Sequence, residues 1–145
     1  MLRYQLLDLE TRSFTDFASG DLTRAAASIS LMETDQENAS IDSQVEQDGE
    51  GASAIEAMCN AVAKAVNFDF VVDFCRVPGK ITFQGRRGSM GRQEVMVNIL
   101  AGPKDKRLQY CERGSDPDVT TAACLGLLAA INTAIKAQAE QSVAV

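Results

Sequence analysis

The sequence predicts an α+β fold made of two successive units, each with three antiparallel strands followed by a helix that packs on the sheet. Three observations support this fold: strand-like alternation of apolar and polar residues, two stretches of helical periodicity, and the repetition of that order along the chain. We place the units at about 1–67 and 68–137, related by pseudo-two-fold symmetry, so that one domain spans 1–137. Residues 138–145 are expected to form a frayed tail.

Strands come first in each unit. Residues 2–9 form the first expected strand, although the adjacent Leu6 and Leu7 leave its buried face undecided. Residues 23–32 and 39–46 alternate apolar and polar side chains, as strands with one solvated face do. In the second unit, the expected strands are 68–75, 94–100 and 107–113. A glycine-rich loop at 78–92 is expected between the first and second of these strands.

Each predicted helix has a marked start. Apolar residues at helical spacing over 55–66 follow a Ser-x-x-Glu capping box at 53–56. A second apolar stripe at 124–135 follows Asp-Pro-Asp at 116–118, where Asp116 can cap the helix and proline suits the first helical position.

Glycines precede both helices, Gly49 and Gly51 before the first and Gly114 before the second. We interpret them as parts of the turns that open the helices. A helix N-terminus suits a carboxylate or phosphate, so two such starts together would form a pocket for a small carboxylic acid. The spacing alone favours the alternative interpretation, in which these glycines only permit tight turns.

Composition narrows the classes of function. The 145 residues carry 14 basic and 20 acidic side chains, and the net charge of −6 disfavours nucleic acid or an anionic membrane as partner. No run of about 18 apolar residues is present, so we expect no membrane span. The chain has no histidine, which removes Ser–His, Cys–His and His–metal chemistry, and we predict no catalytic residues, no metal and no cofactor. The cysteines form no Cys-x-x-Cys pair and are expected to be buried or half-buried thiols in a cytoplasmic protein: Cys59, Cys75, Cys111 and Cys124.

Four segments resemble the C-terminal allosteric dimerisation domain of α-isopropylmalate synthase and citramalate synthase: GEGASAIEAMCNAVAKAV (49–66), FVVDFCRV (70–77), EVMVNI (94–99) and ERGSDPDVTTAACLGLLAAIN (112–132). The family pattern has a G-x-G turn before the first helix, D-[YF] on an apolar strand, and G-x-D-x-D before the last helix. Here these motifs are Gly49 with Gly51, Asp73 with Phe74, and 114–118. The resemblance covers nearly the whole chain.

The resemblance implies a domain that is not an enzyme by itself. The parent enzyme of the family is an acyltransferase that condenses acetyl-CoA with a 2-oxo acid, and this domain dimerises and binds the end-product amino acid for feedback inhibition. A homodimer, leucine or isoleucine as effector, and the catalytic domain of a synthase as partner, in the same or a separate chain, are therefore implied. The effector pocket carried over from the family comprises Gly49, Gly51, Ala54, Val71, Phe74, Val77, Val95, Pro117 and Val119.

Two departures from the family pattern keep other functions open. Ala52-Ser53 and Glu56-Ala57 stand where the family has a proline and a D-A pair, and 88–93 reads GSMGRQ where the family has G-G-T-D-A. One alternative is a dimerisation module without ligand binding, which an amino-acid binding assay separates from a sensor. The other is an independent enzyme of unknown type, disfavoured because no acid, base and nucleophile converge.

Overall fold

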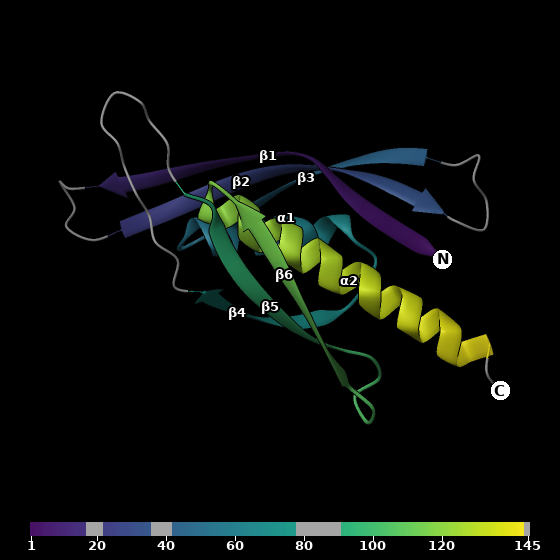
Figure 1. The fold of residues 1–145 in the computed structure, drawn as a ribbon. Helices are drawn as coiled ribbons and strands as arrows, with labels where there is room; N and C mark the ends of the chain where they lie inside the picture. The colour runs from purple at the N-terminus through teal and green to yellow at the C-terminus, as the bar shows by residue number, and fades with distance from the viewer. Residues whose placement is uncertain (17–21, 36–41, 78–90, 144–145) are drawn as a thin grey trace. The chain divides into compact units, whose positions relative to one another are not determined.

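The computed structural model describes residues 1–16, 22–35, 42–77 and 91–143, so most of the predicted loop at 78–92 lies outside the described residues. The elements in chain order are β1 (Leu2–Asp16), β2 (Leu22–Asp35), β3 (Asp42–Gly51), α1 (Ala54–Ala65), β4 (Phe70–Val77), β5 (Gln93–Ala101), β6 (Leu108–Asp116) and α2 (Val119–Val143) (Figure 1).

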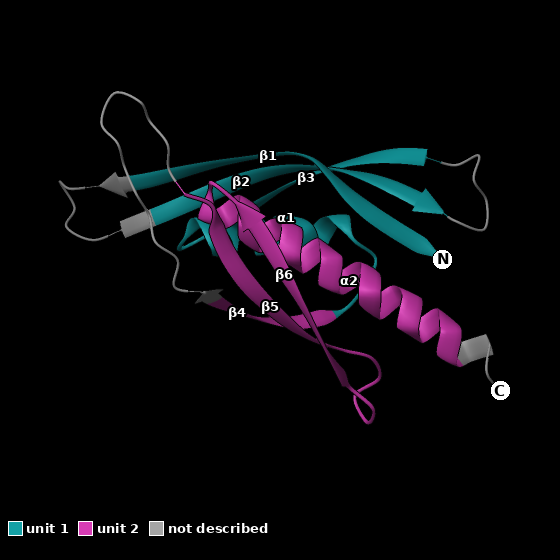
Figure 2. Cartoon of the chain, in the orientation of Figure 1, with its two compact units in different colours: residues 1–69 teal, residues 70–145 magenta. Residues whose placement is uncertain are grey.

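The chain divides into two compact units, residues 1–69 and 70–145, close to the predicted boundary (Figure 2). Each unit holds one antiparallel three-stranded sheet, ordered β1-β2-β3 in the first and β4-β5-β6 in the second. Helix α1 packs on β2 and β3, and helix α2 packs on β5 and β6. The predicted α+β class, with three strands and one helix in each unit, is therefore confirmed.

The central strand of each sheet turns alternate residues toward its helix, as the sequence alternation predicted. Strand β1 carries a bulge, because its register against β2 shifts between Leu6 and Asp8. Leu7 is consequently 45% exposed, while Leu6 and Leu9 pair with residues on the helix-facing side of β2. The bulge explains why the double leucine obscured the buried face of this strand. The buried residues of the two central strands are Ala25, Ala27, Ile29, Leu31, Gln93, Val95, Val97, Ile99 and Ala101.

Helix α1 begins with the predicted capping box. The Ser53 hydroxyl accepts a hydrogen bond from the Glu56 backbone N–H (3.1 Å), and the Glu56 carboxylate accepts one from the Ala52 N–H (3.1 Å). The buried face of this helix consists of Ala57, Met58, Ala61, Val62 and Ala65.

Helix α2 begins at Val119, two residues later than predicted. Asp118, not Asp116, caps the helix, because its carboxylate accepts hydrogen bonds from the Thr121 backbone N–H (2.9 Å) and hydroxyl (2.8 Å). The Asp116 carboxylate instead accepts from the Asp118 N–H (2.9 Å), and Pro117 precedes the helix. At the other end, α2 continues to Val143, past the predicted fraying point at Gln138, since alanine, glutamine and glutamate sustain a helix there.

By length and composition, α2 could cross a membrane over Val119–Gln141, with a mean hydropathy of 1.5 in its most apolar stretch. The prediction of no membrane span counted only unbroken apolar runs and therefore missed this helix. Of that stretch, 56% is buried within the protein.

Candidate functional site

Gly49 lies inside β3 and Gly51 is its last residue, so these glycines do not form the predicted turn. A Cβ at Gly49 would meet backbone atoms of Ala57 and Ala61, and a Cβ at Gly51 would lie 2.9 Å from the Ala57 backbone nitrogen. The backbone of α1 therefore occupies the space that the missing side chain of Gly49 leaves open. The alternative interpretation, that these glycines only permit tight turns, is also wrong for Gly49, because Gly49 lies within a strand and the neighbour that requires a glycine there is a helix.

Gly114 has the same role in the second unit. It lies inside β6, where a Cβ would meet backbone atoms of Ala122 and Gly126 on α2. In both units these helix contacts lie 8 and 12 residues after the glycine. The predicted turn at Gly114 is therefore wrong for the same reason as that at Gly49: a close helix-to-strand crossing requires glycine there.

The starts of both helices are already occupied by side chains of the protein. Ser53 and Glu56 cap α1, and the carboxylates of Asp116 and Asp118 accept backbone N–H groups at the start of α2. A ligand carboxylate at the start of α2 would meet like charge from both aspartates. The structure thus gives no support to the predicted carboxylate site at this helix start.

The predicted pocket residues are divided between the two units. Gly49, Gly51 and the half-buried Ala54 belong to residues 1–69, and the other six belong to residues 70–145. Pro117 is exposed and Val119 is half-buried, both at the start of α2.

Within the second unit, the predicted residues of β4 and β5 do not share one face of the sheet. Val95 is 2% exposed and faces α2, and the half-buried Phe74 lies on the same side because it pairs with Val97. Val71 pairs with Leu100 on the opposite face and is 49% exposed. Successive side chains of a strand alternate between faces, so a spacing of three residues separates Val71 from Phe74. The remaining member of the set, Val77, ends β4.

An open cavity of about 440 Å³ lies beside the start of α1, at the end of the first sheet. Phe14 pairs with Arg24, and Ala26 pairs with Glu50, so an aromatic ring, a guanidinium and a carboxylate come from three adjacent strands. Of the predicted site residues, only Gly51 lines this cavity.

The chemistry of this cavity suits an amino acid. A guanidinium binds carboxylates, a carboxylate binds an ammonium group, and the Phe14 ring with Ala26 offers apolar surface. A second open cavity of about 470 Å³ on the same sheet has acidic walls, formed by Asp8, Glu10, Glu46 and Asp48.

Sequence reasoning missed Phe14, Arg24 and Glu50. The available signal was Phe14, a single aromatic residue in the polar segment TRSFTD, which the structure leaves 56% exposed. Within the described parts of the chain, no group of three or more Cys, Asp or Glu side chains is arranged to hold a metal ion.

The cysteines are all free, and two of them are exposed, contrary to the expectation of buried or half-buried thiols. Cys75 and Cys111 lie on the solvent-facing side of the second sheet, whereas Cys124 is buried. Burial, with a smaller contribution from the charge of Glu56, raises the pKa of the Cys59 thiol to about 11.

We therefore expect iodoacetamide to modify Cys75 and Cys111 in the folded protein, and Cys59 and Cys124 only after unfolding. The thiolate is the reactive form, and a raised pKa keeps Cys59 protonated at about pH 8. Intact mass and peptide mapping before and after denaturation measure the sites. Modification of Cys59 as fast as that of Cys75 would contradict its burial.

Comparison of this chain with protein-family models found no match, and comparison with curated proteins found none either.

Proposed function

We propose that this chain is a cytoplasmic regulatory module that self-associates and binds leucine or isoleucine, for feedback inhibition of an α-isopropylmalate or citramalate synthase. The observation that carries the ligand part is the cavity lined by Phe14, Arg24 and Glu50 beside the start of α1. It offers opposite charges for the two ends of a zwitterion and apolar surface for an aliphatic side chain. We further propose that the two units are related by pseudo-two-fold symmetry, which the shared glycine-to-helix spacing supports.

The self-association part is supported by how α2 covers its sheet. The main contacts of α2 in the second unit are with β5 and β6. The helix-facing side of β4 carries three apolar side chains that are only half-buried, Phe70, Val72 and Phe74. Apolar surface that stays partly exposed favours association with further surface.

Leucine or isoleucine at about a hundred times its dissociation constant should add about 2.7 kcal/mol to the stability of the folded chain. For a chain of this size we expect the melting temperature to rise by about 5–10 °C. Thermal unfolding with leucine, isoleucine, valine and lysine, together with calorimetry, measures the effect. Arg24→Gln should remove the shift because the carboxylate loses its cation, while Arg3→Gln, on β1 outside this cavity, should keep it. If neither leucine nor isoleucine moves the melting temperature of the wild-type chain, the sensor function is rejected.

A dimerisation module without ligand binding is the second candidate. The observation that favours it is the packing of helix backbone against Gly49 and Gly114, which removes the need for a ligand at these glycines. This candidate predicts a dimer in light scattering, together with melting temperatures that no amino acid changes.

A further inference from the structure

The outer edge of β3 is protected by its own helix. The Asn60 side-chain amide donates to the Glu50 carbonyl oxygen (2.5 Å), and the Lys64 ammonium donates to the Asp48 carbonyl oxygen (3.0 Å). Side chains of α1 reach these two carbonyls around the edge of the sheet, which indicates that both carbonyls point away from β2. Unpaired edge strands invite pairing with another chain, and these bonds occupy the groups that such a chain would use.

The edge of β6 lacks this protection. Gly114 corresponds to Gly49 by its helix contacts, so Leu125 and Ala129 stand on α2 where α1 has Asn60 and Lys64. Neither Leu125 nor Ala129 has a side-chain donor. Both are half-buried, and they leave an apolar margin beside the strand.

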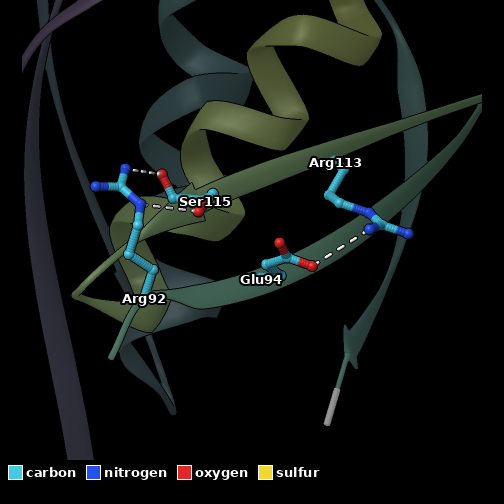
Figure 3. Close-up of polar contacts among 4 residues, drawn as sticks. All are labelled: Arg92, Glu94, Arg113 and Ser115. Atoms are coloured by element: carbon cyan, nitrogen blue, oxygen red, sulfur yellow. Dashed lines mark hydrogen bonds and ion pairs between the residues drawn. The ribbon is translucent and has the colours of Figure 1, made fainter. Parts of the chain in front are cut away.

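The correspondence with β3 also shows which backbone groups of β6 face outward. Arg113 and Ser115 take the places of Asp48 and Glu50, and the alternation of an antiparallel ladder extends the outward set to Cys111 and Gln109. The Ser115 carbonyl accepts from the Arg92 guanidinium (3.1 Å), which closes that end of the edge (Figure 3). Among the described residues, no side chain donates to the Cys111 or Arg113 carbonyl.

We propose that the β6 strands of two copies pair antiparallel about Cys111 and join the two sheets into one of six strands. This inference rests on the proposed self-association and assigns it to the edge of β6, the edge strand opposite β4 in the sheet, on independent evidence. Antiparallel pairing about Cys111 brings the same surface of both subunits together, as a two-fold symmetric dimer requires. This pairing sets Gln109 opposite Arg113 of the partner subunit. Centring the pairing on Arg113 would place like charges directly opposite each other, which destabilises paired strands.

Cross-linking of the full-length chain tests the register. The two Cys111 Cα atoms would lie about 5.5 Å apart, as in a hydrogen-bonded antiparallel pair. A short bis-maleimide should therefore give a covalent dimer from the wild-type chain and from Cys75→Ser, and none from Cys111→Ser. Cys75 is the matched control, since it is also exposed and lies on the other edge strand of the same sheet. Cross-linking that requires Cys75 and not Cys111 overturns the proposal.

A proline provides the second test. Arg113→Pro removes an outward N–H that the β5–β6 ladder does not use, so the subunit should still fold. The proposed pairing between two β6 strands needs this N–H, so the dimer should be lost. Light scattering should show a monomer for this variant and a dimer for Glu46→Pro, the same change on the protected β3 edge; circular dichroism checks that both are folded. A dimer that survives in folded Arg113→Pro and does not cross-link at Cys111 rejects the β6 edge but leaves self-association standing. A monomeric wild-type chain at tens of micromolar rejects self-association itself.

Discussion

Gly114→Ala should lower the free energy of unfolding by about 3 kcal/mol, a large effect for one added methyl group. The new Cβ would meet the Ala122 carbonyl oxygen and the Gly126 backbone nitrogen of α2. Backbone atoms cannot rotate out of the way as a flexible side chain can, so the helix itself must shift. Because α2 also packs on β5, such a shift disturbs the buried contacts of Val95 and Val97.

Urea unfolding monitored by circular dichroism measures this loss. Cys111→Ala is the control on the same strand, since Cys111 is exposed and points away from α2; we expect a change within about 0.5 kcal/mol. Gly49→Ala should resemble Gly114→Ala, because its Cβ would meet the equivalent backbone atoms of α1. A Gly114→Ala variant as stable as Cys111→Ala would show that α2 does not cross β6 at this distance.

The strands were predictable because the central strand of each sheet buries one face and exposes the other. Buried apolar residues alternate with more exposed residues along both strands, for example Ile29 and Leu31 in β2 and Val97 and Ile99 in β5. The sequence shows the same alternation of apolar and polar residues. The start of α1 was equally predictable, since its capping box uses only local contacts around Ser53. Features set by neighbours a few residues away could be read directly.

The glycines were misplaced because their role is tertiary. Gly49 and Gly114 follow polar residues and precede helices, which is typical of turns, yet both lie within strands. What distinguishes a turn glycine from a crossing glycine is the helix that packs on it, and that contact joins residues 8 and 12 positions apart. No local pattern carries this information.

The cavity was missed because it depends on strand register. Phe14, Arg24 and Glu50 lie on three different strands and meet only through the pairings of β1 with β2 and of β2 with β3. The bulge beside Leu7 shifts the first of these registers by one residue, and such a slip moves every later side chain to the other face. Alternation alone did not locate that bulge.

Ile99→Ala should cost about 2–5 kcal/mol of stability, with the loss concentrated in residues 70–143. Ile99 is fully buried in the middle strand of the second sheet, and removal of its side chain leaves a cavity between that sheet and α2. The chain divides into two compact units with separate sheets, so a cavity in one core weakens the contacts of that unit first.

Hydrogen exchange with mass spectrometry, read peptide by peptide, measures where protection is lost. In Ile99→Ala, peptides from β5 and α2 should exchange faster while those from β2 and α1 keep their wild-type rates. Leu31→Ala is the matched variant, because Leu31 is also fully buried in the middle strand of its sheet, and its pattern should be the reverse. Equal loss of protection in both units from either change would mean that the two units unfold as one cooperative body. In that case a cavity in one core would lower the stability of both units by the same amount.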